Sequence, residues 1–150
     1  MNTYFITGAT GVLGSAIIRE LLLNTKSKLI LLIRAENDDQ VLQKMKSLFT
    51  FLEINLLEVK DRVDFVRGDI ELNNFGLDSK IFVELGRIVT HIIHSAASVR
   101  MNLPLDLARK SSVLATENIL RLANLCLQNG TLQKVEVVST VGVGGKWKGA

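Results

Sequence analysis

The chain has 150 residues, of which 47% are hydrophobic and 22% charged, a length and composition typical of one folded domain. Its formal net charge of +3 comes from basic residues scattered among acids, which gives no indication of nucleic acid binding. The longest unbroken apolar run, residues 29–33, is far shorter than the roughly 20 residues that span a bilayer, and the amino terminus has no basic segment followed by a hydrophobic one. We therefore expect a cytoplasmic protein with no membrane span and no nucleic acid partner.

Cysteine usage excludes two classes of site. Cys126 is the only cysteine, so the sequence has neither a disulfide framework nor a thiolate cluster for a metal. Its spacing from Leu122, Ala123 and Leu127 indicates the buried side of a helix. We therefore predict a buried thiol at this position and no metal site.

In the first half of the chain, short apolar runs alternate with longer segments of helical period. Strands are predicted over residues 4–7, 28–33 and 63–66, and the second is apolar at five successive positions, as expected for a strand covered on both faces. A helix is predicted over residues 11–24. Another begins at Asp38 or Asp39, either of which can cap it, and reaches the region of Val59. Its apolar residues recur at spacings of four, three and four: Val41, Met45, Leu48 and Leu52.

In the second half, the pattern predicts a short helix over residues 79–86 closed by a glycine, and a strand over residues 88–94. A long helix begins near Pro104 and runs to about residue 128, where Asn129 and Gly130 stop it, and a fifth strand covers residues 135–139. Strict alternation of strands and helices predicts one α/β domain over residues 1–150, a doubly wound parallel sheet of the Rossmann type. The glycine-rich tail after the fifth strand leads us to expect that a larger protein has been cut, or naturally ends, just beyond this strand.

Three glycines, Gly8, Gly11 and Gly14, follow the first predicted strand in the sequence TGATGVLG. In a doubly wound sheet this turn lies at the carboxyl ends of the strands, where a dinucleotide binds. Gly8 would permit the tight turn, Gly11 would let the backbone approach a pyrophosphate, and Gly14 would let the helix pack closely on the strand. The spacing is GxxGxxG rather than the usual GxGxxG. We predict a dinucleotide site here, with free N–H groups of the helix facing the phosphates.

The residue after the second predicted strand bears on which dinucleotide binds. An acidic residue there accepts a hydrogen bond from the ribose hydroxyl of NAD, whereas an arginine can pair with the 2′-phosphate of NADP. The sequence has Arg34 at this position, which favours NADP(H). Lys44 is a second candidate cation, and it fits a solvated helix face equally well. Glu36 and Asp38 follow closely and are alternative ribose acceptors.

The motifs TGATGVLG, LLIRA, GDI, HSAASVR and VVSTVGV follow successive predicted strands in this order. With them, nearly the whole chain resembles the extended short-chain dehydrogenase/reductases. It is most similar to their thioester-reductase branch, which includes terminal reductase domains of nonribosomal peptide and polyketide synthases, carboxylic acid reductases and fatty acyl-CoA reductases of the male-sterility type. TGATGVLG and GDI are shared with nucleotide-sugar epimerases, whereas IIHSAASVR and PLDLARKSSVLATENILRLA are closer to the reductases.

The resemblance implies cofactor contacts residue by residue. It implies that Arg34 holds the 2′-phosphate and that Asp69 and Ile70 flank the adenine. The residues implied to pass under the ribose and nicotinamide are Ser95, Ala96 and Ala97. Those implied to line the pyrophosphate are Thr7, Gly8, Thr10, Gly11, Val12 and Leu13.

Some of these residues have a plainer interpretation. Asp69 also fits a turn cap, and small residues at a strand end also let a helix pack closely. His94 fits a structural histidine hydrogen-bonded to backbone better than a catalytic base, and His91 has no motif support. Related families often carry NVxGTxN in the long helix, with the first Asn near the cofactor. Here residues 112–118 read SVLATEN, so Ser112 stands where the resemblance implies that Asn.

The chemistry of the family uses a hydroxyl after the fifth strand and a Tyr-x-x-x-Lys pair on the next helix. The resemblance places the hydroxyl at Thr140, with Ser139 as second choice, donating a hydrogen bond to the carbonyl oxygen as hydride arrives. The only tyrosine, Tyr4, is on the first predicted strand and has no lysine four residues later. Lys146 and Lys148 fit a solvated loop. We therefore expect this chain to bind NADP(H) with little or no turnover.

The resemblance implies a parent reductase that transfers hydride from NADPH to an acyl thioester, on coenzyme A or an acyl carrier protein, and gives an aldehyde or an alcohol. Two alternatives stay open from the sequence. A nucleotide-sugar epimerase or dehydratase of the same superfamily usually keeps an acidic residue where Arg34 stands. A non-catalytic scaffold that binds NADP(H) would need no proton donor.

Overall fold

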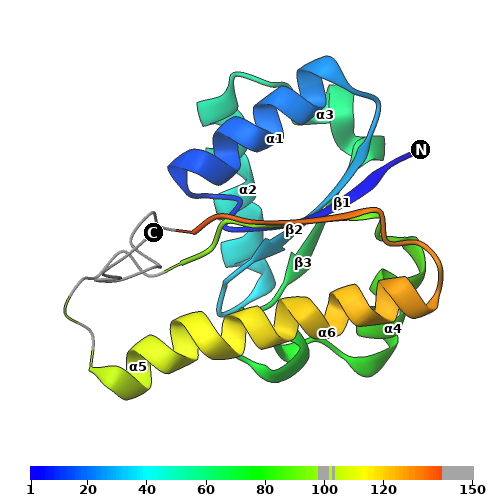
Figure 1. Cartoon of the computed structure of the whole chain (residues 1–150). Coiled ribbons are helices and arrows are strands. Elements are labelled where there is room, and N and C mark those ends of the chain that lie inside the picture. The colour runs from blue at the N-terminus through cyan, green and yellow to red at the C-terminus, as the bar shows by residue number, and fades with distance from the viewer. Residues whose placement is uncertain (98–101, 103, 140–150) are drawn as a thin grey trace, which may run out of the picture.

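A computed structural model describes residues 1–97, 102 and 104–139, and Figure 1 shows a central sheet between two layers of helices. Five parallel strands form the sheet in the order β3-β2-β1-β4-β5. Their bounds are β1 Thr3–Thr7, β2 Lys28–Ile33, β3 Val63–Arg67, β4 His91–His94 and β5 Lys134–Val137. The order reverses between β1 and β4, so the predicted doubly wound parallel sheet is confirmed.

The helices divide between the two faces of the sheet (Figure 1). One face carries α1 (Val12–Asn24), α2 (Asp38–Leu52) and α3 (Leu56–Val59). The other carries α4 (Ser79–Ile88), α5 (Leu105–Arg109) and α6 (Ala115–Gln128). Short helical turns complete the chain: η1 (Lys60–Arg62), η2 (Asn73–Gly76) and the π-helical turn η3 (Lys110–Leu114), which joins α5 to α6.

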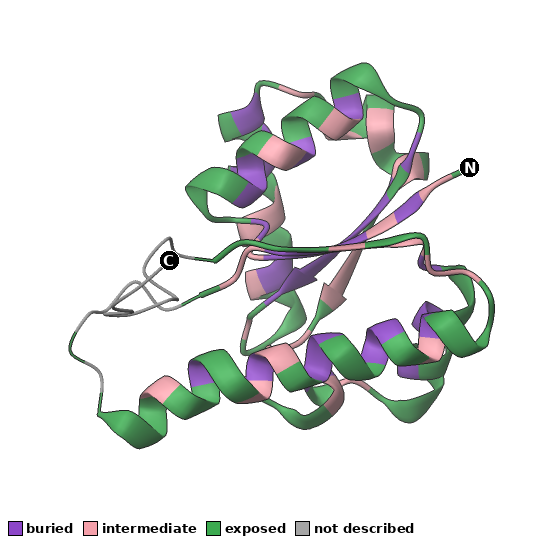
Figure 2. Cartoon of the chain, in the orientation of Figure 1, coloured by how far each residue is buried: buried purple, intermediate pink, exposed green. Residues whose placement is uncertain are grey.

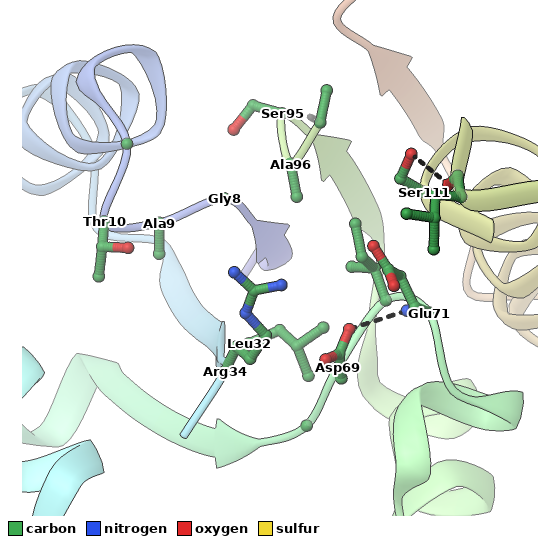
Figure 3. A pocket seen from close by; sticks show the side chains of 15 residues that line it. Gly8, Ala9, Thr10, Leu32, Arg34, Asp69, Glu71, Ser95, Ala96 and Ser111 are labelled. Carbon is green, nitrogen blue, oxygen red and sulfur yellow. Dashed lines mark hydrogen bonds between the residues drawn. The ribbon is translucent and has the colours of Figure 1, made fainter. Parts of the chain in front are cut away.

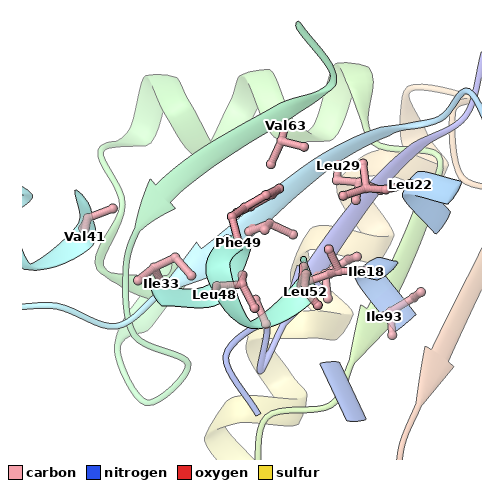
Figure 4. Packing of buried hydrophobic residues seen from close by; sticks show 13 residues of the cluster. Ile18, Leu22, Leu29, Ile33, Val41, Leu48, Phe49, Leu52, Val63 and Ile93 are labelled. Atoms are coloured by element: carbon pink, nitrogen blue, oxygen red, sulfur yellow. The ribbon is translucent and has the colours of Figure 1, made fainter. Parts of the chain in front are cut away.

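Each layer of helices covers its own cluster of buried hydrophobic residues. Side chains of β2 alternate between them: Leu29, Leu31 and Ile33 lie in the cluster under α1 and α2 (Figure 4), and Ile30 and Leu32 lie in the cluster under α4 and α6. The continuous apolar run of β2 therefore serves both faces. Figure 2 shows the buried residues of the long helix on the side that faces the sheet.

The predicted buried thiol is confirmed. The side chain of Cys126 is fully buried in the second cluster, and burial raises the pKa of its thiol, because charging it would require desolvating a thiolate. Within residues 1–97, 102 and 104–139, no helix combines the length and apolarity needed to cross a membrane.

The second helix is shorter than the periodicity predicts. Glu53 has a left-handed backbone (φ 55°) and ends α2 at Leu52, and Asn55 then caps the separate helix α3. The predicted continuous helix to Val59 is therefore wrong. The predicted cap was also misplaced, by one residue for Asp38 and two for Asp39: the side chain of Asn37 accepts the hydrogen bond from the N–H of Gln40, 2.9 Å away.

The glycine expected to close the next helix has a packing role instead. α4 continues through Gly86 to Ile88, and β4 begins at His91 rather than at residue 88. A Cβ on Gly86 would lie 2.4 Å from Cγ of Leu125, so the glycine lets α4 and α6 approach each other. Sequence alone does not distinguish such a contact from a helix end.

The long helix begins after Pro104, as predicted, and ends at Asn129 and Gly130. The π-helical turn within it was not predicted. β5 covers Lys134–Val137, one residue earlier at its start and two at its end than predicted. The N–H groups of Gln133 and Lys134 both donate to the carbonyl oxygen of Thr90, which sets this start.

Candidate functional site

A cleft of about 550 Å³ opens at the carboxyl ends of β1, β2, β3 and β4, where the strand order reverses (Figure 3). Both the glycine turn after β1 and the chain that follows β4 contribute to its wall. This is the place where open α/β sheets bind ligands. The described residues that line it are Gly8, Ala9, Thr10, Gly11, Leu32, Arg34, Gly68, Asp69, Ile70, Glu71, Ser95, Ala96, Ala97, Leu107 and Ser111.

The glycine turn, residues 8–14, depends on the absence of side chains. Gly8 has a left-handed backbone (φ +75°), and a Cβ there would lie 2.6 Å from the backbone N of Ala96. A Cβ on Gly14 would lie 2.1 Å from the carbonyl oxygen of Gly8, so only glycine lets α1 start this close to the turn. The N–H of Gly11 donates to that same oxygen over 3.0 Å, which closes the turn.

The amino end of α1 is suited to an anion. Gly11 occupies the cap position, and in the described part of the chain no side chain caps the helix. The first N–H groups of a helix have no partner within it, and the helix dipole adds partial positive charge. Gly11 itself lines the cleft, so this helix end can offer backbone N–H groups to a phosphate there.

Beneath the turn, β1 and β4 are locked together by side chains. Thr7 Oγ1 and His94 Nδ1 share a hydrogen bond of 2.7 Å, and both residues are buried. Burial lowers the pKa of His94, because the charged imidazolium is poorly solvated there. Ser95 Oγ donates to the carbonyl oxygen of Thr7 over 2.8 Å. His94 therefore has a structural partner, although this is a hydroxyl rather than the backbone group predicted.

The positive end of the cleft is formed by Arg34, which follows β2. Figure 3 shows its guanidinium among the cleft-lining side chains. Lys44 Nζ donates to the carbonyl oxygen of Arg34 over 2.6 Å, which fixes the backbone from which this side chain projects. No carboxylate of the described residues forms an ion pair with it. The guanidinium is thus available to a ligand.

The neighbouring carboxylates lie elsewhere. Among the described residues that line the cleft, neither Glu36 nor Asp38 is present. Asp38 Oδ1 is 3.4 Å from Arg67 Nε, and Arg67 Nη1 donates to the carbonyl oxygen of Glu36 over 3.0 Å. Arg67 therefore engages this acidic segment outside the cleft. The alternative ribose acceptors are less well placed than Arg34.

The wall opposite the glycine turn comes from the β3 loop, which we define as residues 68–76. Its first four residues line the cleft. Asp69 Oδ1 accepts a hydrogen bond from the N–H of Glu71 over 2.9 Å, so Asp69 both caps a turn and faces the cleft. The turn-cap interpretation and the cleft position of this residue are compatible.

The structure brings most of the predicted cofactor residues together. Those that line the cleft are Gly8, Thr10, Gly11, Arg34, Asp69, Ile70, Ser95, Ala96 and Ala97. Those that do not are Thr7, Val12, Leu13, Gly14 and Lys44. Each of the latter still adjoins it in the chain or supports a lining residue, as Thr7 does through Ser95 and Lys44 through Arg34.

Sequence reasoning missed several lining residues, including Leu32, Gly68, Glu71, Leu107 and Ser111. Ser111 is the informative case. It is buried in the π-helical turn and lines the cleft, whereas Ser112, which stands where related families have an Asn near the cofactor, is exposed. A π-helical turn changes which residues face one side of a helix, and the sequence carries no signal for it.

Neither hydroxyl residue predicted for the chemistry is among the described residues that line the cleft. Ser139 follows β5, is exposed and is not among the described lining residues, and Thr140 lies outside the described residues. Tyr4 is on β1, where its ring stacks on His91 with centroids 4.5 Å apart. It does not line the cleft, consistent with its exclusion as proton donor.

Comparison with known proteins identifies the family of this domain. An NAD-binding family described as male sterility protein matches residues 6–150. The chain belongs to this family. The family match makes it a nicotinamide dinucleotide-binding domain, and the resemblance to extended short-chain dehydrogenase/reductases of the thioester-reductase branch is confirmed.

Relatives of this male sterility protein family domain are parts of large reductases. The chain is 35% identical over 147 residues to glycine betaine reductase ATRR of Emericella nidulans, covering 95% of this chain and 11% of that protein. It is 31% identical over 141 residues to L-2-aminoadipate reductase of Schizosaccharomyces pombe, covering 93% and 10%. The chain thus spans about a tenth of the length of these relatives.

A solved structure gives the same result for the fold. The terminal R domain from the myxalamid PKS-NRPS biosynthetic pathway superposes with a TM-score of 0.80 and is 31% identical. The match covers 95% of this chain and 36% of that domain.

Proposed function

We propose that this domain binds NADP(H) and holds it for the reduction of an acyl thioester. The observation that carries the choice of cofactor is Arg34, whose guanidinium lines the cleft at the end of β2 while Glu36 and Asp38 stay outside it. A guanidinium offers two parallel hydrogen bonds to a phosphate, whereas the ribose hydroxyl of NAD calls for a carboxylate.

The backbone of the site fits a diphosphate. Gly8 and Gly14 leave no room for side chains, so the carbonyl and amide groups of the turn stay close to the cleft. Gly11 lines the cleft, and a Cβ there would make a tight contact of 3.3 Å with the carbonyl oxygen of Gly8. Thr10 lines the cleft beside it, and we assign the pyrophosphate to this end.

The remaining contacts follow from the shape of the cleft. Asp69 lies beside Arg34 in Figure 3, Ile70 follows it in the lining of the cleft, and both are assigned to the adenine. Ser95, Ala96 and Ala97 have small side chains that leave space under a ribose and a nicotinamide ring. When bound, the dinucleotide supplies a hydride. The domain holds the dinucleotide in one orientation relative to the substrate.

The substrate class rests on the relatives. Proteins named as aminoadipate and glycine betaine reductases, and a terminal R domain of a synthase, share this domain, which supports a thioester on a carrier protein or coenzyme A as substrate. Thr140, with Ser139 as second choice, stays our proposed donor to the carbonyl oxygen. The only tyrosine is Tyr4, so we expect the 150-residue chain to bind the dinucleotide without turnover by itself.

The test is calorimetric titration of the chain with NADPH and NADH. We expect NADPH to bind at least about tenfold more tightly, a difference of about 1.4 kcal/mol, and Arg34→Ala to remove most of that difference. Arg87→Ala is the matched control, because Arg87 is an exposed arginine of α4 that pairs with Glu84 and does not line the cleft. Equal affinities for the two nucleotides would refute NADP, and no binding of either would refute the site.

A further inference from the structure

We propose that Asn118 is a positioning residue for the adenine end of the cleft, acting through the β3 loop. This inference rests on the proposed function, because it assigns a role to the wall that would contact the adenine half of NADP(H). Asn118 does not line the cleft itself. It lies on α6, shortly after the π-helical turn that carries Ser111 into the cleft.

The contacts of Asn118 are directed entirely at the β3 loop. Its Nδ2 donates to the carbonyl oxygens of Ile70 and Leu72, over 2.9 and 2.8 Å, and its Oδ1 accepts from the N–H of Asn74 over 3.1 Å. The side chain is 0% exposed. A buried amide with both N–H donors and its oxygen engaged is fully specified in orientation, so the loop is fixed relative to α6.

The loop needs such support because its backbone is unfavourable. Asn74 (φ 49°) and Phe75 (φ 62°) adopt left-handed conformations, which are costly for residues other than glycine. Phe75 is fully buried against Phe5 and Phe82, so the far end of the loop is held by packing. The Asn118 amide holds its middle, next to the residues that face the cleft.

The hydrogen bonds at this position favour asparagine over other residues of similar size and shape. An aspartate could accept from Asn74 but would place a carboxylate against the carbonyl oxygens of Ile70 and Leu72. An apolar residue would remove the side-chain partner of the Ile70 carbonyl oxygen and of the Asn74 N–H, and would leave the Leu72 carbonyl oxygen with only the N–H of Phe75. Ile70 is the direct link to the site, since its carbonyl binds Asn118 and it also lines the cleft.

The experiment compares Asn118→Ala and the milder Asn118→Ser with Leu122→Ala. Leu122 is also 0% exposed, lies one turn further along α6 and packs in the core, so its truncation lowers stability while leaving the three hydrogen bonds of Asn118 in place. Affinity is measured by calorimetry for NADPH and for adenosine 2′,5′-bisphosphate, which carries the adenine half alone. Hydrogen exchange at the amides of residues 68–76 is measured in the same variants.

We expect the Asn118 variants to bind both ligands more weakly by the same factor, about tenfold for Asn118→Ala, and Leu122→Ala to stay within about twofold of the unsubstituted chain. The Asn74 amide should exchange faster in the Asn118 variants only. If Asn118→Ala is too unstable to titrate, Asn118→Ser carries the comparison.

Two results would overturn the inference: unchanged affinity in the Asn118 variants, or loop exchange no faster than in Leu122→Ala. If the unsubstituted chain binds neither ligand, the proposed function fails instead, and the exchange data alone decide whether Asn118 positions the loop.

Discussion

The glycine turn and the β3 loop face each other across one cleft, and they reach left-handed backbone by different means. In the glycine turn Gly8 adopts it without a side chain, and Gly14 admits the helix because it lacks one. In the β3 loop Asn74 and Phe75 adopt it with side chains present. The first is specified by residues close in sequence, and the second is imposed by contacts from α6 and the core.

The two walls of the cleft are therefore held rigid by different kinds of interaction. The glycine turn depends on what is absent, so any added atom disturbs it. The β3 loop depends on partners that lie 44 to 48 residues away, so it can be loosened without altering the loop itself. Substitutions that separate these two kinds of dependence test the comparison directly.

Gly14→Ala should have the largest effect. Its Cβ would lie 2.1 Å from the carbonyl oxygen of Gly8, so either α1 or the turn must move. Because overpacking typically costs about 1–3 kcal/mol and the contact here is with backbone, we expect the free energy of unfolding to fall by about 3 kcal/mol, with loss of dinucleotide binding. Denaturant unfolding and calorimetry measure both.

Gly130→Ala is the control for that substitution. Gly130, unlike Gly14, has a left-handed backbone (φ +73°), and a Cβ there would meet nothing within 4 Å. It should lose only the conformational part, about 1–2 kcal/mol, and keep its affinity. Equal losses at the two positions would show that steric contact is not what makes Gly14 special.

A smaller effect is expected from pH, acting beneath the glycine turn. Burial lowers the pKa of His94 below its ordinary value of 6.5, so below that pH the unfolded chain binds a proton that the folded chain resists. The contribution of neutral His94 to stability is therefore complete above pH 6.5 and is lost as the pH falls through that value toward its folded pKa.

His94→Asn removes the titrating group while keeping a side chain that can hydrogen-bond Thr7. We expect stability to fall less steeply between pH 7 and 5 in this variant, as followed by thermal unfolding. His91, whose pKa is also lowered mainly by burial, stays in both proteins and so cancels from the difference. Parallel pH profiles would contradict the assignment to His94.

The smallest effect is expected in the β3 loop itself. Asn74→Gly keeps the backbone N–H that donates a hydrogen bond to Asn118 Oδ1. It removes the conformational cost of a left-handed backbone at a residue with a side chain (φ 49°). The free energy of unfolding should therefore rise by about 0.5–1 kcal/mol. The neighbouring Asn73 is not left-handed, and its side chain accepts a hydrogen bond from Arg121. Asn73→Gly should therefore lose stability, and a gain there would undo the argument.

The same contrast explains how much of the molecule is predictable from sequence. β2 is identified at its observed bounds because continuous burial appears as a continuous apolar run. Arg34 is identified because its place after that run is local information. Gly8 and Gly14 are identified by their spacing, and the structure shows the tight turn and close packing assigned to them.

What sequence reasoning missed depends on distant contacts. Gly86 was interpreted as a helix end because its partner, Leu125, belongs to another helix. Ser111 was not identified, because a π-helical turn leaves no trace in residue type. Asn118 was noted only as part of a motif, since its partners are backbone atoms of a loop that has no periodicity.

The central place of β1 also sets an order of events during translation. Tyr4 pairs with Leu29 on one side and with His91 on the other, and the hydrogen-bonded Thr7 and His94 are 87 positions apart. At ordinary rates of synthesis one edge of β1 waits roughly 4 to 17 s for its neighbour to be made. Until then the nascent chain exposes an apolar strand of the kind that chaperones retain. The described cleft therefore cannot be complete until β4 and the turn that carries Ser111 have left the ribosome.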